Sequence, residues 1–208
     1  QGYSSAASDV YKRQAVDDMK PWLSAYGDTL AHTPNMDRLA ARGTLFSSAY
    51  CQVALSGPTR SSLLTGLNPD HTGVWWLQAS FRKNNPDIVT LPQALKNNGY
   101  ETVGVGKVYH PLHDKTVKDD PQSWSLPYVK TPGQTYALAN GRVATECADV
   151  PDITYVDGVI ADEAVKTMAK LSKGDKPFFL GVGFKKPHLP FCAPKKYWDM
   201  YDLSLIHI

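Results

Sequence analysis

Apolar residues in the middle of the chain follow two spacings, one typical of amphipathic helices and one typical of buried strands. The helical spacing, together with start and stop signals, predicts helices at Thr33–Gly43, Ser56–Thr65, Leu91–Asn98 and Asp157–Gly174. Short runs rich in apolar, β-branched or aromatic residues predict strands at Thr44–Cys51, Glu101–Val105 and Pro177–Val182. Residues 111–155 have no clear period, so we expect a long excursion over the surface there.

This order of elements predicts the fold class. Helices that alternate with fully apolar strands are typical of α/β proteins, in which helices flank a mostly parallel central sheet on both faces. The chain has 208 residues, of which 42% are hydrophobic and 20% charged, so it can form a substantial core. No apolar run approaches the roughly 18 residues of a membrane span, and we therefore expect no membrane-spanning segment.

Charge and cysteine content exclude some classes of function. Lysine and arginine number 22 and aspartate and glutamate 20, which leaves a net charge of +2. Such a small surplus gives no case for a surface that binds the phosphates of nucleic acid. Cys51, Cys147 and Cys192 are odd in number and far apart, so they predict neither a disulfide framework nor a metal site, and they do not fix the redox compartment.

The two ends of the chain differ from its middle. Residues 1–14 are polar, without a period and without the apolar segment of a secretory signal, and residues 203–208 read LSLIHI. Both stretches resemble translated sequencing adapters. We therefore expect them to be non-native tails on an internal fragment of a longer protein, with the fold in residues 15–202. An authentic disordered terminus is the alternative.

Two groups of residues in the first third of the chain could carry chemistry. Asp17 and Asp18 are adjacent carboxylates, which repel each other unless they are exposed or share a cation such as Ca²⁺ or Mg²⁺. Ser56 begins a predicted helix, where free N–H groups favour an anion, and Arg60 lies one turn further on the same face. Arg60 could bind an oxyanion or fix the group at position 56. A solvated turn, and a serine cap followed by a solvated arginine, are the simpler alternatives.

Cationic and titratable side chains also follow two predicted strands. Lys107 and His110 come after Glu101–Val105, and a Lys-Lys-Pro-His stretch that ends in His188 comes after Pro177–Val182. The carboxyl ends of parallel strands face the crevice in which α/β proteins bind ligands. A single histidine is more often structural than catalytic. Two such strand ends, with an aspartate pair and a serine–arginine pair, together predict an active site.

The stretch Ser56–Arg60 reads Ser-Gly-Pro-Thr-Arg and resembles the type I sulfatase motif of the alkaline-phosphatase superfamily, which is Cys or Ser, any residue, Pro, any residue, Arg. Thr33–Asp37 and Gly99–Thr102 resemble further signatures of the same family. Asp17–Trp22, Gly106–Pro111 and Lys186–His188 resemble in particular its iduronate-2-sulfatase-like members. The resemblance covers about residues 15–202. It implies the N-terminal part of a sulfatase catalytic domain, with an incomplete α/β fold.

The resemblance implies a nucleophile and a metal site. Ser56 would be oxidised to formylglycine by a maturase, of the radical-SAM type that serves serine-type bacterial members. Its hydrate would attack the sulfur atom of the substrate. Asp17, Asp18 and residue 56 would bind one divalent cation, Ca²⁺ or Mg²⁺, which lowers the pKa of the hydrate and holds the sulfate.

The resemblance also implies roles for the remaining polar residues. Arg60 and Lys107 would neutralise negative charge on the nucleophile and the sulfate. His110 would help to expel sulfate from the intermediate, and His188 would donate a proton to the leaving alcohol. The implied activity is removal of 2-O-sulfate from uronic-acid residues of glycosaminoglycans, by a protein exported to the periplasm or beyond in a bacterium.

The chain departs from the family pattern in ways that limit this activity. The apolar strand that precedes the aspartate pair in the family is reduced to Ala15 and Val16, and the downstream metal ligands and a further lysine are expected beyond residue 202. We therefore expect this fragment to be inactive and the activity to belong to its parent. The alternatives are a metal-dependent phosphatase or phosphodiesterase with an unmodified Ser56, and a degenerate domain that binds sulfated glycans.

Overall fold

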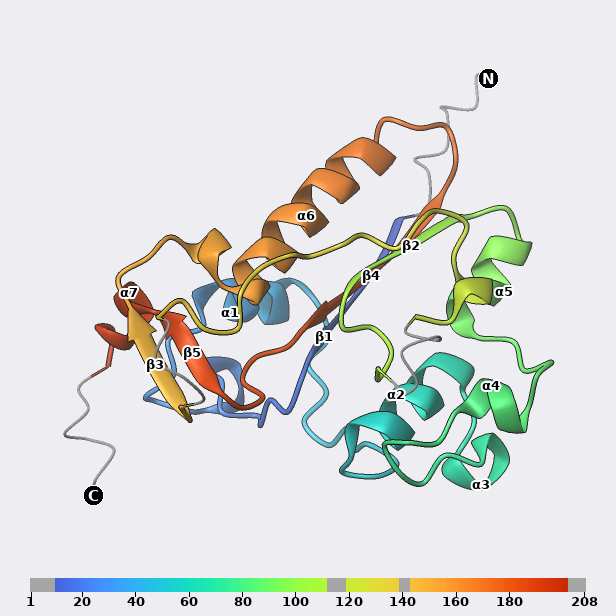
Figure 1. The fold of residues 1–208 in the computed structure, drawn as a ribbon, viewed down its shortest axis with the longest axis horizontal. Helices are drawn as coiled ribbons and strands as arrows, with labels where there is room; N and C mark the ends of the chain where they lie inside the picture. Colours follow the sequence, from blue (N-terminus) through green and yellow to red (C-terminus); the bar gives the residue numbers. More distant parts are fainter. Residues whose placement is uncertain (1–9, 112–118, 139–142, 202–208) are drawn as a thin grey trace.

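The computed structural model describes residues 10–111, 119–138 and 143–201. Its centre is a parallel sheet in the order β1-β4-β2, formed by Val10–Val16, Phe178–Phe184 and Glu101–Gly106 (Figure 1). The strands β3 (Thr145–Ala148) and β5 (Phe191–Pro194) pair in parallel as a separate small sheet. The predicted α/β class with a mostly parallel sheet is confirmed.

Helices cover both faces of the central sheet, which explains why β4 is apolar at every position. Successive side chains of a strand point to opposite faces. Phe178 and Leu180 pack on one face with residues of α6 (Val156–Leu171), whereas Phe179 packs on the other with Leu64 and its neighbours. The second face is covered by α2 (Ser56–Thr65) and α5 (Leu91–Asn97).

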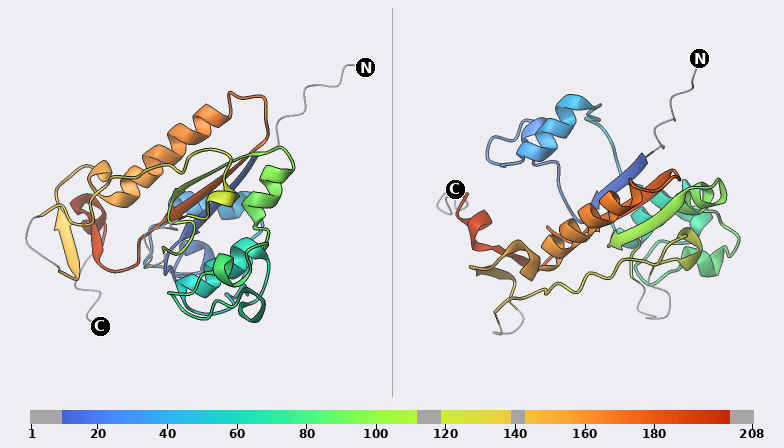
Figure 2. Two further views of the ribbon diagram at one scale, coloured as in Figure 1. Left: turned by 45° about the vertical axis from the view of Figure 1, so that its right-hand side comes forward. Right: turned by 90° about the horizontal axis from the view of Figure 1, so that it is seen from above.

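The remaining helices are short. The α-helices are α1 (Pro34–Arg42), α3 (Pro69–Thr72), α4 (Phe81–Asn84) and α7 (Lys195–Trp198). The 3₁₀ turns are η1 (Ser24–Tyr26), η2 (Pro121–Ser123) and η3 (Asp152–Thr154). Helix α1 buries none of its residues and lies apart from the sheet (Figure 2, right). In the part of the chain that the structure describes, no helix is both long and apolar enough to cross a membrane.

Most predicted elements form, but two expectations are wrong. Residues Thr44–Cys51 form no strand, and all of them are exposed. Their β-branched and aromatic side chains suit a strand, but none of the described strands pairs with them, and a strand needs a partner for its backbone groups. The segment 111–155 is not a simple surface excursion, because its described part contains β3 and the buried side chain of Trp124.

Strand β1 begins within the stretch that we expect to be a non-native tail, and that expectation stays a prediction. It runs in register with β4, from Val10 beside Phe178 to Val16 beside Phe184. Backbone hydrogen bonds do not depend on side-chain identity, so the polar stretch 10–14 can pair with the apolar β4 while its side chains stay exposed. Residues 1–9 and 203–208 lie outside the described residues.

The ends of β2 and β4 approach each other closely because both carry glycine. The N–H of Lys107 donates to the carbonyl of Gly183 at 2.7 Å. A Cβ atom on Gly183 would overlap the carbonyl oxygen of Lys107. Gly106, with φ +77°, adopts the left-handed backbone that turns the chain out of β2. The two glycines thus set the positions from which Lys107 and the segment after β4 leave the sheet.

Substitution Gly183→Ala should therefore destabilise the chain by about 1–3 kcal/mol or more, since the backbone of Lys107 must move away from β4. The change is measured as the free energy of unfolding in urea, followed by tryptophan fluorescence. Gly43→Ala is the matched control: its Cβ would make only an ordinary contact of 3.4 Å with the carbonyl oxygen of Leu39. Equal stability of the two variants would contradict the close approach described here.

Candidate active site

Asp17 and Asp18 lie at the carboxyl end of β1 and differ in their exposure to solvent. The N–H of Asp17 donates to the carbonyl of Phe184 at 3.2 Å, which continues the pairing with β4. Asp18 has a φ of +59°, a left-handed conformation that aspartate tolerates better than most residues. This turn leaves the Asp17 side chain 4% exposed and the Asp18 side chain 56% exposed.

Ser56 is the first residue of α2 and contacts two of the predicted site residues. Its Oγ donates to Asp17 Oδ1 at 3.4 Å and accepts a hydrogen bond from Arg60 Nε at 3.1 Å. Leu55, and not Ser56, occupies the N-cap position, so the alternative of a capping serine is wrong. The helix ends at Gly66, which adopts a left-handed φ of +73° and donates its N–H to the carbonyl of Ser62.

Arg60 connects three separate parts of the chain. Its Nη2 donates to Asp17 Oδ1 at 2.8 Å, and its Nη1 donates to the carbonyl of Val108 at 3.0 Å and to the carbonyl of Lys107. The Arg60 side chain is buried, which excludes the alternative of a solvated arginine. The guanidinium therefore joins α2 to the end of β1 and to the segment that follows β2.

Lys107 completes the cluster, because its Nζ pairs with Asp17 Oδ2. Burial alone would raise the pKa of Asp17, but hydrogen bonds from Lys107 and Arg60 outweigh it and hold that pKa below its usual range. Two cations on one buried carboxylate leave a local surplus of positive charge. Such a surplus, beside the hydroxyl of Ser56, suits a site that binds an anion.

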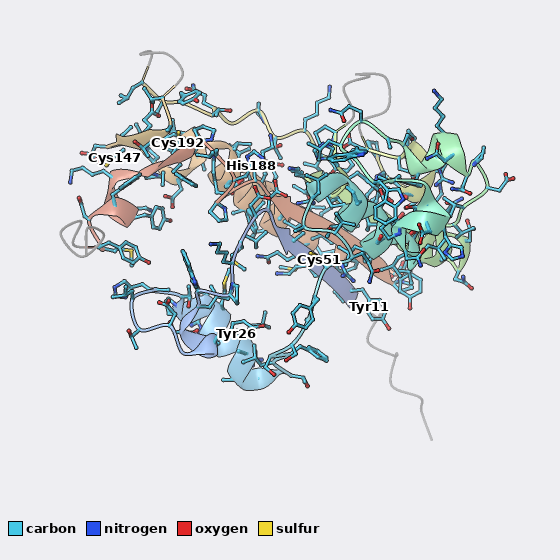
Figure 3. All side chains as sticks on the ribbon, turned by 90° about the horizontal axis from the view of Figure 1, so that it is seen from below. Tyr11, Tyr26, Cys51, Cys147, His188 and Cys192 are labelled. Carbon is cyan, nitrogen blue, oxygen red and sulfur yellow. The ribbon has the colours of Figure 1, made fainter. Side chains whose placement is uncertain are left out.

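His188 lies on the segment after β4 (Figure 3), and this segment brings it close to Asp18. Its Nε2 lies 3.8 Å from Asp18 Oδ2, while its Nδ1 donates to the carbonyl of Leu189 at 2.8 Å. One ligand atom each from Asp17, Asp18 and His188 lies within 4.8 Å of the others. The structure thus places His188 beside the predicted metal ligands, and the carboxylate oxygens of the two aspartates suit Ca²⁺ or Mg²⁺.

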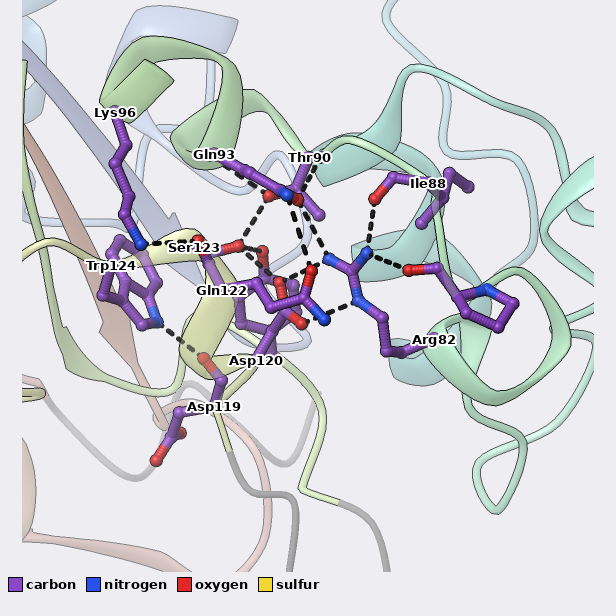
Figure 4. Close-up of polar contacts among 12 residues, drawn as sticks. Arg82, Ile88, Thr90, Gln93, Lys96, Asp119, Asp120, Gln122, Ser123 and Trp124 are labelled. Atoms are coloured by element: carbon purple, nitrogen blue, oxygen red, sulfur yellow. Dashed lines mark hydrogen bonds and ion pairs between the residues drawn. The ribbon is translucent and has the colours of Figure 1, made fainter. Parts of the chain in front are cut away.

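His110 follows on the same segment as Lys107 and is half-buried. The residue before it, Tyr109, contacts Ser123 Oγ at 2.6 Å, and Ser123 donates to Asp120 Oδ2 at 2.5 Å. Arg82 binds both carboxylate oxygens of Asp120 at 3.0 Å (Figure 4). This network holds the segment through contacts that do not involve Asp17 or Asp18. Burial raises the pKa of Tyr109, so its hydroxyl remains protonated.

Sequence patterns did not reveal this network. Arg82 and Asp120 are 38 residues apart, and no period or motif links them. Gly183 was also missed, although a glycine inside a buried strand often marks a close backbone approach and could have been noticed. The three cysteines, by contrast, are free thiols and take no part in the contacts described for the site (Figure 3).

The ion cluster predicts a specific pH dependence for the metal-free chain. Because the native pKa of Asp17 lies below the unfolded value of about 3.9, its ionised form stabilises the fold fully above that value. This stabilisation is lost as the pH falls through the native pKa. Substitution Asp17→Asn should cost about 3–5 kcal/mol near neutral pH, since it leaves two buried cations without an anion.

The difference in unfolding free energy between the wild type and Asp17→Asn should shrink as the pH is lowered from about 6 to about 2. Urea titrations at a series of pH values measure it. A difference that stays constant over this range would contradict the assigned pairing of Asp17.

Comparison with known proteins gives the family. The sulfatase family model matches residues 15–204. Iduronate 2-sulfatase of Mus musculus is 40% identical over 204 residues, and that of Homo sapiens is 37% identical. Each alignment covers 92% of this chain but only 37% of the relative, so the chain spans little more than a third of their length.

Solved structures agree with this assignment. A protein determined in complex with its substrate, D-glucosamine-2-N,6-O-disulfate, matches with a TM-score of 0.67 and 29% identity, over 87% of this chain and 35% of that one. Phosphonate monoester hydrolase of Agrobacterium radiobacter matches with a TM-score of 0.68 at 22% identity, over 95% of this chain and 44% of that one, and so shares the fold. With its α/β fold, its Ser-x-Pro-x-Arg motif and these matches, the chain belongs to the sulfatase family.

Proposed function

We propose that the complete protein hydrolyses sulfate esters and removes 2-O-sulfate from uronic-acid residues of glycosaminoglycans. One observation carries the proposal: Ser56 Oγ lies between Asp17 and Arg60, and Lys107 holds the other oxygen of Asp17. The identity of 40% with an iduronate 2-sulfatase supports the choice of substrate. Because this chain spans 37% of that relative, we expect it to be inactive without the rest of its catalytic domain.

The reaction would begin with Ser56 oxidised to formylglycine by a radical-SAM maturase, its transient protein partner. The hydrated aldehyde would supply the hydroxyl that attacks sulfur; this hydroxyl would lose its proton to water, and the bond between sulfur and the alcohol oxygen would break. His188, as the imidazolium, would give the proton on Nε2 to that oxygen, and Arg60 and Lys107 would balance the charge of the sulfate. His110 would then take a proton from the second hydroxyl, so that sulfate leaves and the aldehyde returns.

A divalent cation fits the donor set of Asp17, Asp18 and residue 56, because all three offer oxygen ligands of the kind that Ca²⁺ and Mg²⁺ prefer. Arg60 and Lys107 already contact the two carboxylate oxygens of Asp17. Oδ1 of Asp17 accepts from both Ser56 and Arg60, whereas Oδ2 pairs with Lys107 and keeps a second lone pair, through which Asp17 can bind a cation without losing these partners. When bound, the cation lowers the pKa of the hydrate and orients the sulfate.

The substrate suggests where the protein acts. Sulfated glycosaminoglycans are large, charged molecules found outside cells, so we place the parent protein in the periplasm or outside a bacterium. The serine at position 56, where other members carry cysteine, is the feature that assigns it to a bacterial maturase of the radical-SAM type. A sulfated saccharide is the expected binding partner.

The test is to co-express the full-length protein with such a maturase. The peptide that contains Ser56 should lose two hydrogens in mass, and the enzyme should release sulfate from a disaccharide with a 2-O-sulfated uronic acid. Substitution Ser56→Ala should lower turnover roughly 10⁴-fold or more, as loss of a nucleophile does. A chelator of divalent cations should also abolish turnover, and added Ca²⁺ should restore it.

Three outcomes would contradict the proposal in different ways. Turnover of phosphate esters with an unmodified Ser56 would indicate a phosphatase of the same superfamily. Binding of sulfated saccharides without turnover or dependence on a cation would indicate a degenerate binding domain. Release of sulfate from other sulfated sugars alone would leave the enzyme class standing but reject the 2-O-sulfated uronic acid.

A further inference from the structure

The segment between β4 and β5 carries His188 and is held by a carboxylate outside the site. Asp157 accepts two backbone hydrogen bonds, one per oxygen: Lys185 N–H donates to Oδ1 at 2.9 Å and Lys186 N–H donates to Oδ2 at 2.8 Å. These are the first two residues after β4. Both oxygens of Asp157 are thus used to fix the direction in which the chain leaves the sheet.

The position of Asp157 is itself fixed by the core. It lies in the first turn of α6, beside Val156 and one turn before Ala161. Val156 and Ile160 are 4% and 0% exposed, and both belong to the apolar cluster that α6 forms with β2 and β4. A negative side chain in the first turn of a helix is also favoured by the helix dipole. Asp157 therefore holds a segment without regular structure at a fixed position relative to α6.

The two anchored residues in turn hold His188. Its N–H donates to the carbonyl of Lys185 at 3.1 Å, and Lys186 Nζ donates to the carbonyl of His188 at 3.1 Å. The Nδ1–H of His188 donates to the carbonyl of Leu189. This leaves Nε2 on the side of Asp18, the side on which the reacting group would lie.

We propose that Asp157 is a positioning residue that sets the place and orientation of His188 for protonation of the leaving alcohol. This inference rests on the proposed function, which gives His188 its role. Asp157 does not touch the reacting atoms and acts through Lys185, Lys186 and their contacts with His188. A carboxylate suits this task because two successive N–H donors need two acceptors, whereas an asparagine offers one acceptor and one competing donor.

A positioning role for Asp157 predicts different effects on two classes of substrate, whereas a general loss of structure predicts the same effect on both. An alkoxide is a poor leaving group, so a sugar sulfate needs the proton from His188, whereas a nitrophenolate leaves readily without one. A misplaced His188 should therefore slow the hydrolysis of sugar sulfates and spare that of aryl sulfates. Loss of the fold, or of the nucleophile, would slow both.

The experiment compares the full-length, maturated wild type with Asp157→Asn on a 2-O-sulfated disaccharide and on 4-nitrophenyl sulfate. We expect kcat on the disaccharide to fall about 10–100-fold, as misplacement of a reacting group by an ångström can do, and kcat on the aryl sulfate to change less than about twofold. Asp162→Asn removes the same charge from an exposed position on the same helix, where Asp162 pairs with Lys166, and should change neither rate.

Two further measurements separate positioning from other causes. His188→Ala should show the same preference for the aryl ester, and adding Asp157→Asn to it should cause little further loss, because both changes remove one function. In the full-length protein, Asp157→Asn should speed hydrogen exchange at the amides of Lys185 and Lys186, while Asp162→Asn should not. This readout needs no activity.

Equal loss on both esters, or no loss on either, would overturn the inference even where the enzyme is an active sulfatase. Unchanged amide exchange at Lys185 and Lys186 in Asp157→Asn would also overturn it, since the contact would then hold nothing in place. If the wild-type enzyme hydrolyses neither ester, the proposed function itself is wrong, and the assignment of a role to Asp157 is wrong with it.

Discussion

The buried ion cluster around Asp17 is the interaction on which the rest of the site depends. Asp17 follows β1, Arg60 comes from α2 and Lys107 follows β2, so one carboxylate joins three segments that lie far apart in the sequence. Removing one partner of a buried ion pair typically costs about 3–5 kcal/mol, because the remaining charge is left uncompensated. The same contacts place the Ser56 hydroxyl within hydrogen-bond distance of both the Asp17 carboxylate and the Arg60 guanidinium. The stability of the fold and the proposed hydrolysis therefore depend on the same few side chains.

The two segments that leave the sheet beside this cluster are each fixed from outside it by a carboxylate. After β2, the ion pair of Asp120 and Arg82 holds Ser123, which in turn contacts the hydroxyl of Tyr109 (Figure 4). After β4, Asp157 binds the backbone directly. In both cases the segment is held by a carboxylate that does not itself belong to the cluster. The parallel strands β2 and β4 direct the two segments to the same edge of the sheet, and these hydrogen bonds fix the segments in position.

The sequence predicted the parts of the site that depend on short spacing or on position at a strand end. Ser56 and Arg60 could be paired because one helical turn separates them, and Lys107 because it follows an apolar strand. The contacts of Asp157 could not be predicted, since they join its side chain to backbone groups 28 and 29 residues away. The false strand at Thr44–Cys51 has a related cause: composition describes a segment but not whether a partner strand lies beside it.

We propose that Asp17, Arg60, Lys107 and position 56 form one site for a cation and a sulfate group. The test is a crystal structure of the full-length protein grown with Ca²⁺ and sulfate. We expect a cation about 2.3–2.6 Å from oxygens of Asp17, Asp18 and residue 56, with sulfate beside Arg60 or Lys107. A structure in which Asp17 is separated from both cationic side chains, or in which the cation and sulfate bind elsewhere, would contradict it.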